Sequence, residues 1–159
     1  MPPKHVVRNL PWQVVLQATY AFRRLAFARE PEAVTHLAVE AMDPDDLRKL
    51  LLSRGLVKGD LASYYYYGEE VNMVRGLYKD DEYEWYQYHV RGFDEENGMR
   101  LRPHTELYWR VYPKEHIQLV NVDVEEGIEL TKAALDDGGF DYEVVPGEGS
   151  STDVTQAVQ

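Results

Sequence analysis

Apolar residues recur at helical spacing near the start of the chain. From Trp12 onward they form one broad stripe, which predicts a largely buried helix to about Ala28 with Pro11 in its first turn. The acidic and proline residues at 30–32 restart the chain, and a second, short helix is expected over 33–42. The first third of the chain is therefore expected to be mainly helical.

A third helix is predicted from Pro44 to about Arg54. Asp43 precedes the proline and is a suitable N-cap, because its carboxylate can accept hydrogen bonds from free backbone amides of the first turn. Gly55 follows the last apolar position, where a left-handed residue commonly ends a helix. This is the most clearly bounded helix that the sequence predicts.

Between residues 64 and 112 the pattern changes to aromatic and apolar runs separated by turns, which is typical of strands. The Asn97-Gly98 pair ends the strongest turn, because both residue types readily adopt positive φ. The pattern predicts an antiparallel meander over 64–112, with strands at 64–67, 71–78, 83–93 and 99–112.

A β-α-β unit is predicted at the C-terminal end. It comprises a strand at 117–122, a helix from Val124 to about Leu135 with Asp123 as its cap, and a strand at 140–145. The expected fold is one α+β domain over residues 1–146, with N-terminal helices packed on a mainly antiparallel sheet. Residues 147–159 have little to bury and are predicted to form a disordered tail.

The charge balance narrows the functional classes. The 159 residues carry 28 Asp and Glu against 17 Lys and Arg, a formal charge of −11. Such a field disfavours non-specific binding to nucleic acid and to anionic membranes. The most apolar run is interrupted by glutamine and arginine, so it predicts neither a membrane span nor a signal peptide, and a cytoplasmic location is expected.

Cysteine is absent, which excludes disulfides, a thiolate nucleophile and cysteine-ligated zinc. Six of the 17 basic residues are lysine. An acidic, lysine-poor, cysteine-free composition resembles the cytoplasmic proteins of salt-loving microbes, although an ordinary acidic cytosolic protein fits it equally well.

Three histidines and a glutamate form the first candidate site. His89, His104 and His116, with Glu106, are residue types that bind zinc or iron, although their spacing matches no compact metal motif. A metal site at His89, His104 and Glu106 depends on strand register. Pairing Phe93 with Gly98 sets His89 opposite Arg102, and a one-residue slip sets it opposite Pro103 and turns His104 to the other face.

The leading hypothesis is a binding face on the meander. Arginines gather there in an otherwise acidic chain, and guanidinium groups bind carboxylates and phosphates and stack on aromatic rings. The alternative is cross-strand ion pairing of these arginines with glutamates on a solvated surface. The candidate residues for an anionic ligand are Tyr86, Tyr88, His89, Arg91, Arg102 and His104.

The tyrosine run at 64–67 is a candidate protein interface, including a surface for self-association into a homo-oligomer, although core or edge packing explains it as well. The predicted helices also resemble a winged helix-turn-helix in outline. Asp43, Asp45 and Asp46 at the start of the predicted recognition helix would repel phosphate, so DNA binding is the weaker alternative.

No Gly-rich phosphate loop and no Gly-x-Ser-x-Gly elbow is present. The sequence therefore predicts a small, non-enzymatic binding or interaction protein without a cofactor, acting on an anionic ligand or a protein partner. The alternatives are a DNA-binding regulator and a small metal-dependent enzyme that uses His89, His104 and Glu106.

Overall fold

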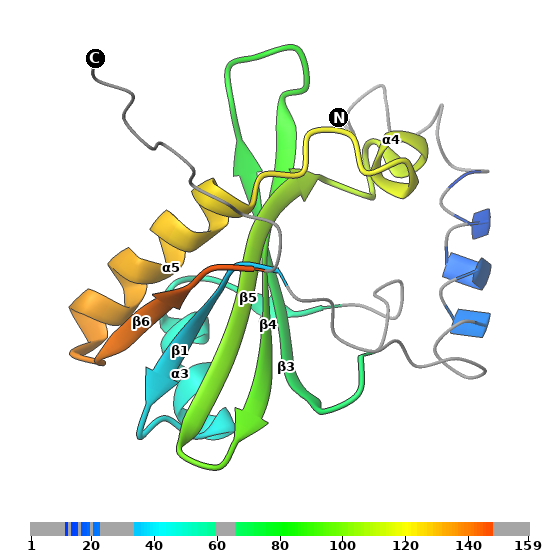
Figure 1. Ribbon diagram of the computed structural model, residues 1–159. Helices are drawn as coiled ribbons and strands as arrows, with labels where there is room; N and C mark the ends of the chain where they lie inside the picture. The colour runs from blue at the N-terminus through cyan, green and yellow to red at the C-terminus, as the bar shows by residue number, and fades with distance from the viewer. Residues whose placement is uncertain are drawn as a thin grey trace, which may run out of the picture.

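A single antiparallel sheet organises the described part of the chain (Figure 1). The computed structural model describes residues 34–59 and 66–147, together with residues 12, 14, 15, 17–19, 21 and 22. The strands follow the order β2-β3-β4-β5-β1-β6 across the sheet. They are β1 (His36–Glu40), β2 (Val57–Lys58), β3 (Glu69–Tyr78), β4 (Trp85–Glu95), β5 (Gly98–Leu107) and β6 (Tyr142–Val145).

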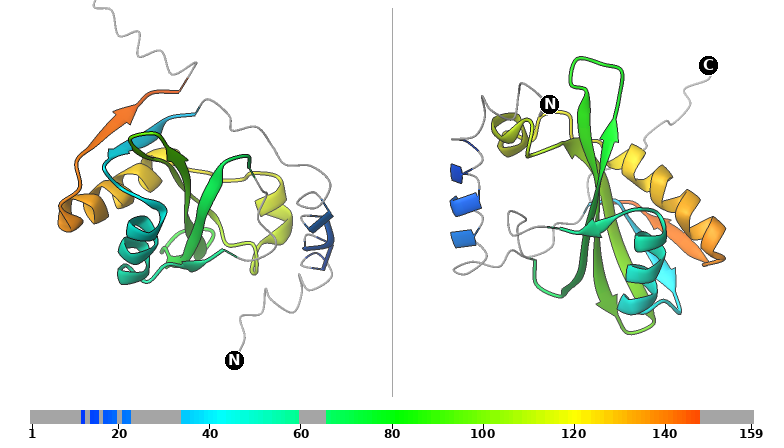
Figure 2. Two further views of the ribbon diagram at one scale, coloured as in Figure 1. Left: turned by 90° about the horizontal axis from the view of Figure 1, so that it is seen from below. Right: turned by 180° about the vertical axis from the view of Figure 1, so that it is seen from behind.

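Two helices cover one face of this sheet. Helices α3 (Pro44–Ser53) and α5 (Val124–Gly138) lie on the same side, whereas the short helix α4 (Pro113–Ile117) lies on the other (Figure 2). The main core fills the space between the sheet and the two longer helices. Its fully buried members include Leu37, Leu47, Leu51, Leu101 and Leu135. The expected α+β class is thus confirmed.

The helix predicted over 33–42 is wrong, because His36–Glu40 forms strand β1. Leu37 and Val39 are buried while His36 and Ala38 are half-buried, a period of two that one sheet face imposes. Strand β1 lies between β5 and β6 and pairs with both. These long-range hydrogen bonds override the helical spacing of the apolar residues. The helix-turn-helix outline behind the DNA-binding hypothesis loses its first helix.

The helix at 44–54 is confirmed at both ends. Asp43 caps it, with its side chain accepting a hydrogen bond of 2.8 Å from the amide of Asp46, and Gly55 follows at φ 78°. The predicted helix after Asp123 is also confirmed and runs longer than expected, to Gly138, before Gly139 turns left-handed. Asp123 accepts from the amide of Glu126 at 2.9 Å.

The strand predicted at 117–122 is wrong. Helix α4 ends at Ile117 and is followed by turns through Asn121, and β5 stops at Leu107, short of the predicted 112. No strand therefore lies directly before α5 in the described chain. Strand β5 is instead the strand before α5 that runs parallel to β6. Both β5 and β6 are antiparallel to β1, which lies between them, and they are hence parallel to each other.

Each described residue between Trp12 and Phe22 is helical, as predicted there. The described members of the apolar stripe are Trp12, Val15, Ala18 and Phe22. All four are exposed, the three large ones at 44 to 64% of their surface, contrary to the expected burial. The predicted tail falls outside the described residues apart from Gly147, whose amide donates to Thr35 Oγ1 at 3.1 Å.

In the described part of the chain, no helix combines the length and the apolarity that a membrane crossing requires.

Candidate metal centre

The register of the β4–β5 pair brings two histidines face to face. His89 pairs directly with His104, Gln87 with Glu106, and Arg91 with Arg102. Both registers considered from the sequence are wrong. They assumed that the strands separate at Phe93, whereas pairing continues to Glu95 and Gly98 and leaves a two-residue turn. The longer hairpin shifts every partner and sets the histidines opposite each other.

Four of the six candidate ligand residues share one sheet face. His89, Arg91, Arg102 and His104 form direct cross-strand pairs, and by strand alternation they point away from the face on which Tyr88 contacts α5. Tyr86 and Tyr88 alternate to the other face. The hydroxyl of Tyr88 lies 2.5 Å from Thr131 Oγ1 on α5, and Tyr86 packs in a small apolar cluster around Leu107. The two tyrosines therefore do not line the candidate site.

Glu106 is the centre of the cluster. Its Oε1 lies 3.3 Å from His89 Nδ1 and 3.4 Å from His104 Nε2. The ligand atoms of His89, His104 and Glu106 all lie within 4.8 Å of one another. The imidazole rings of the two histidines are 4.9 Å apart between centroids. We call these three residues the metal-ligand triad.

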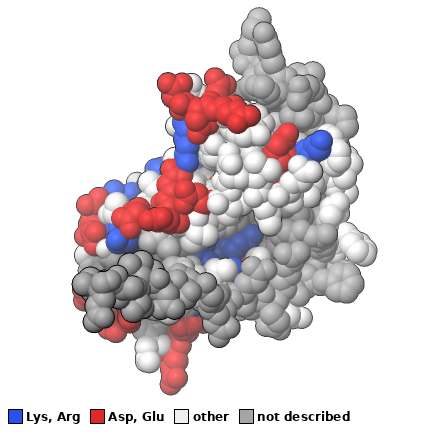
Figure 3. Space-filling view, turned by 45° about the horizontal axis from the view of Figure 1, so that its top comes forward, with Lys and Arg blue, Asp and Glu red and all other residues white. Residues whose placement is uncertain are grey.

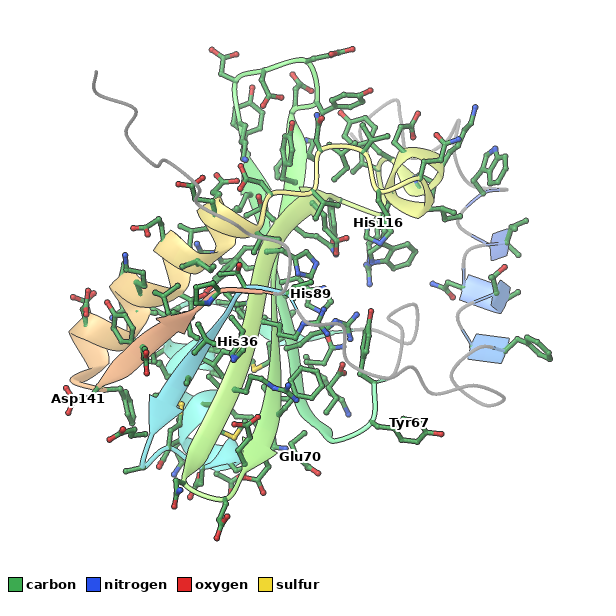
Figure 4. The ribbon with its side chains drawn as sticks, in the orientation of Figure 1. His36, Tyr67, Glu70, His89, His116 and Asp141 are labelled. Carbon is green, nitrogen blue, oxygen red and sulfur yellow. The ribbon has the colours of Figure 1, made fainter. Side chains whose placement is uncertain are left out.

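A third imidazole reaches the same carboxylate from α4. His116 Nδ1 lies 2.8 Å from the carbonyl oxygen of Leu107 and 3.5 Å from Glu106 Oε2. Figure 4 shows His116 pointing from α4 toward the region that His89 enters from β4. The carboxylate is thus enclosed by imidazoles on both of its oxygens.

Strand β3 contributes polar groups that the sequence pattern missed. Asn72 Oδ1 lies 2.9 Å from His89 Nε2, and Asn72 Nδ2 donates to Glu69 Oε1 at 2.9 Å. Glu69 Oε2 in turn accepts from Arg91 Nη1 at 2.5 Å. Residues 69 and 72 would occupy opposite faces of a regular strand. A register shift between Glu69 and Val71 brings them together.

Gln87 completes the group beside Glu106. Its Nε2 donates to Glu106 Oε1 at 2.6 Å, and its side chain is 3% exposed. Gln87 Oε1 is buried and has no hydrogen-bond partner among the described residues. The neighbouring position on β3 is Gly76, where no described atom lies within 4 Å of an added Cβ. Gln87 Oε1 is therefore a buried acceptor without a donor among the described residues.

Burial and neighbouring charged groups shift the pKa values of His89 and Glu106. Burial lowers the pKa of His89 to about 3, and the nearby Arg91 guanidinium acts in the same direction. Burial also acts to raise the pKa of Glu106, but the neighbouring His116 and His104 outweigh it and hold that pKa well below its usual range. A neutral imidazole and an ionised carboxylate are the forms in which these side chains bind metals.

The dimensions of the triad suit a small divalent metal ion. Zinc binds histidine nitrogen and carboxylate oxygen at about 2.0–2.2 Å, so two ligands of a tetrahedral site lie roughly 3.3 Å apart. The distances from Glu106 Oε1 to the two histidines, 3.3 and 3.4 Å, already match that separation. Two imidazoles and one carboxylate also suit iron(II), with coordination positions left open.

Two arginines of this face pair with acidic groups, and a third lies against aromatic rings. Arg91 is buried against Glu69, and Arg100 Nε lies 3.1 Å from Glu95. The guanidinium of Arg102 lies 5.2 Å from the ring centre of Tyr66 and 6.0 Å from that of Phe93. Figure 3 shows Lys or Arg atoms deep in a hollow of the surface, with acidic side chains along its rim.

Of the tyrosine run at 64–67, residues 64 and 65 lie outside the described chain. Tyr66 is buried and packs edge-to-face on Phe93, and Tyr67 is exposed in the turn before β3.

Comparison of the chain with protein-family models, curated proteins and solved structures finds no match. A function must therefore be argued from the chemistry of the buried polar cluster.

Proposed function

We propose that this protein binds one divalent transition-metal ion through His89, His104 and Glu106. The observation that carries the proposal is that both imidazoles direct a ring nitrogen at the same carboxylate oxygen, at 3.3 and 3.4 Å. Each histidine and the glutamate is a common ligand of zinc, iron or manganese. His89 and Glu106 are buried, so bulk water competes little with these two side chains as ligands.

Three protein ligands leave coordination positions for water or for a substrate. That number is typical of catalytic metal sites, whereas structural zinc sites are usually closed by four ligands. His116, 3.5 Å from Glu106 Oε2, lies near enough to orient the carboxylate. The proposal therefore favours the metal-dependent enzyme among the functions considered from the sequence.

A metal titration tests this proposal. Metal-free protein is titrated with Co²⁺, read by its visible absorption, and with Zn²⁺, read by calorimetry, and one ion per chain is expected. The H89A, H104A and E106Q variants should lose affinity by more than about 100-fold, since loss of an outer-sphere partner alone costs 10–100-fold.

The matched control is H36A. His36 lies on β1 of the same sheet, and its Nδ1 is 3.1 Å from the carbonyl oxygen of Val34. This variant should bind the metal like the wild-type protein. The proposal is wrong if the wild-type protein binds none of Co²⁺, Zn²⁺, Fe²⁺ and Mn²⁺, or if H36A loses affinity as severely as H89A.

A second candidate is an anionic ligand on the same face, the leading hypothesis from the sequence. The direct pairing of Arg91 with Arg102 beside the histidine pair favours it, because it concentrates positive charge. Titration with inorganic phosphate and with a nucleoside monophosphate, followed by NMR, tests it. R102A should abolish binding, and R100A, whose arginine pairs with Glu95, is the control. Absence of binding at millimolar concentration would exclude this candidate.

A further inference from the structure

A relay of three side chains leads from Arg91 to His89. Arg91 donates to Glu69 at 2.5 Å, Glu69 accepts from the amide nitrogen of Asn72 at 2.9 Å, and the amide oxygen of Asn72 lies 2.9 Å from His89 Nε2. The relay is built into the sheet, because Asn72 pairs directly with Arg91 across β3 and β4. The side chains of Arg91 and Glu69 are 9% and 6% exposed, so water does not compete strongly for these groups.

The chemistry of each group fixes its orientation. A carboxylate paired with arginine can only accept hydrogen bonds, so the Asn72 amide must turn its NH₂ group toward Glu69. Its oxygen then faces His89 and can only accept. His89 Nε2 must therefore be the nitrogen that carries the proton, and a neutral ring has its lone pair on Nδ1.

This lone pair is directed at another acceptor. His89 Nδ1 lies 3.3 Å from Glu106 Oε1, an oxygen that already accepts from Gln87. Two acceptors at that distance repel each other unless a cation lies between them. A second proton on the ring would also satisfy both, but His89 is 2% exposed, and burial opposes a charged imidazolium ring.

We propose that Asn72, held by Glu69 and Arg91, is a positioning residue that selects Nδ1 of His89 as the nitrogen that binds the metal. The inference rests on the metal function proposed above and adds residues to it that contact no metal. A metal-bound histidine commonly donates its other ring N–H to a carboxylate or carbonyl partner, which fixes both the tautomer and the ring plane. In this protein the amide oxygen of Asn72 is the acceptor for that second N–H of His89.

The relay also explains the role of Arg91. Its guanidinium neutralises Glu69, and without it Glu69 would be a buried, unpaired charge. Arg91 therefore holds the relay in place through its ion pair with Glu69. Because its guanidinium is engaged there, Arg91 does not add to the positive charge that the facing pair of arginines offers an anionic ligand. The relay favours a cation over an anion as the occupant of the triad.

The tautomer can be read directly in the metal-free protein. Long-range ¹⁵N–¹H correlation spectra at pH 7.5 distinguish an imidazole protonated at Nε2 from one protonated at Nδ1. The His89 ring should be protonated at Nε2 in the wild-type protein. In N72L, which has no acceptor at this position, the proton should move to Nδ1, where it can be donated to Glu106, and metal affinity should fall by about 10–100-fold.

The control is T131V, which removes a buried hydrogen bond on the opposite face of the sheet, between Thr131 and Tyr88. It should change neither the His89 tautomer nor the metal affinity. A wild-type ring protonated at Nδ1, or an N72L affinity equal to that of T131V, would overturn the inference. The tautomer of His89 is measured on the wild-type protein, so this part of the test does not depend on whether a variant folds. Failure of the wild-type protein to bind metal, with Nε2 protonated, would instead overturn the proposed function.

Discussion

His89 and His104 occupy directly opposed positions in the β4–β5 pair, with their ring centres 4.9 Å apart. Two imidazoles so close gain little from each other and would repel if both were protonated. The arrangement becomes favourable when both rings are neutral and share a positive ion with Glu106.

Substituting Gly127 should disturb the triad from the other side of the sheet. A Cβ on Gly127 of α5 would lie 2.3 Å from the Cα of His104, so the helix or the strand must move. We expect G127A to lower the free energy of unfolding by about 1–3 kcal/mol and to weaken metal binding. Urea denaturation and a Co²⁺ titration measure the two effects.

The control for that substitution is G76A. No described atom lies within 4 Å of a Cβ added at Gly76, so this variant should retain its stability. If G127A matched G76A in both measurements, the close packing of α5 against β5 would be wrong.

The metal-free protein should lose stability in acid because His89 resists protonation. Its pKa is lowered from 6.5 to about 3 in the folded chain, so below pH 6.5 the unfolded chain takes up a proton that the folded chain does not. The contribution is present in full above pH 6.5 and is lost progressively as the pH falls toward 3, by at most about 1.4 kcal/mol per pH unit. Denaturation at pH 7, 6 and 5 should show a shallower decline for H89A, and parallel curves would contradict this.

Tyr88 should make the protein sensitive to alkali. Burial raises the pKa of Tyr88 to about 12, so its contribution to stability is complete below pH 10 and declines as the pH rises from 10 to 12. The difference of about 2 units corresponds to roughly 3 kcal/mol at most. Comparison of wild-type protein and Y88F by urea denaturation at pH 9 and 11 tests this. The wild-type protein should lose more stability between the two pH values than Y88F does.

Removing the cap of α3 should affect stability alone. Asp43 accepts from the amide of Asp46 at 2.8 Å, and D43A should cost about 1 kcal/mol. D45A is a suitable control, because the ion pair of Asp45 with Arg48 is exposed and contributes little. Both variants should bind metal normally. A loss of affinity in D43A would mean that α3 influences the triad.

Local chemistry in the sequence predicted those elements whose ends are determined by adjacent residues. The helix at 44–54 was predictable because Asp43, Pro44 and Gly55 act within one turn of its ends. The same holds for Asp123 before α5. Neither β1 nor its place in the sheet could be predicted, since its conformation depends on hydrogen bonds to β5 and β6, which are distant in the chain.

The candidate site was predictable only in part. His89, His104 and Glu106 could be chosen by residue type, but whether they meet depends on a two-residue turn whose length the flanking sequence did not determine. Asn72 and Glu69 could not be identified, because the register shift that brings them together depends on how β3 pairs with β4. Their role becomes apparent only through the hydrogen bonds that they make.

The insertion of β1 between β5 and β6 has a consequence for how the chain is made. As the protein leaves the ribosome, β1 emerges early, yet both of its partners are synthesised later, and β6 comes near the end of the described chain. Until then the apolar Leu37 and Val39 have no sheet in which to be buried. The hairpins from β3 to β5, which carry the triad, join neighbouring segments and can form first. A nascent chain could thus bring His89 and His104 together before β1 has its partners.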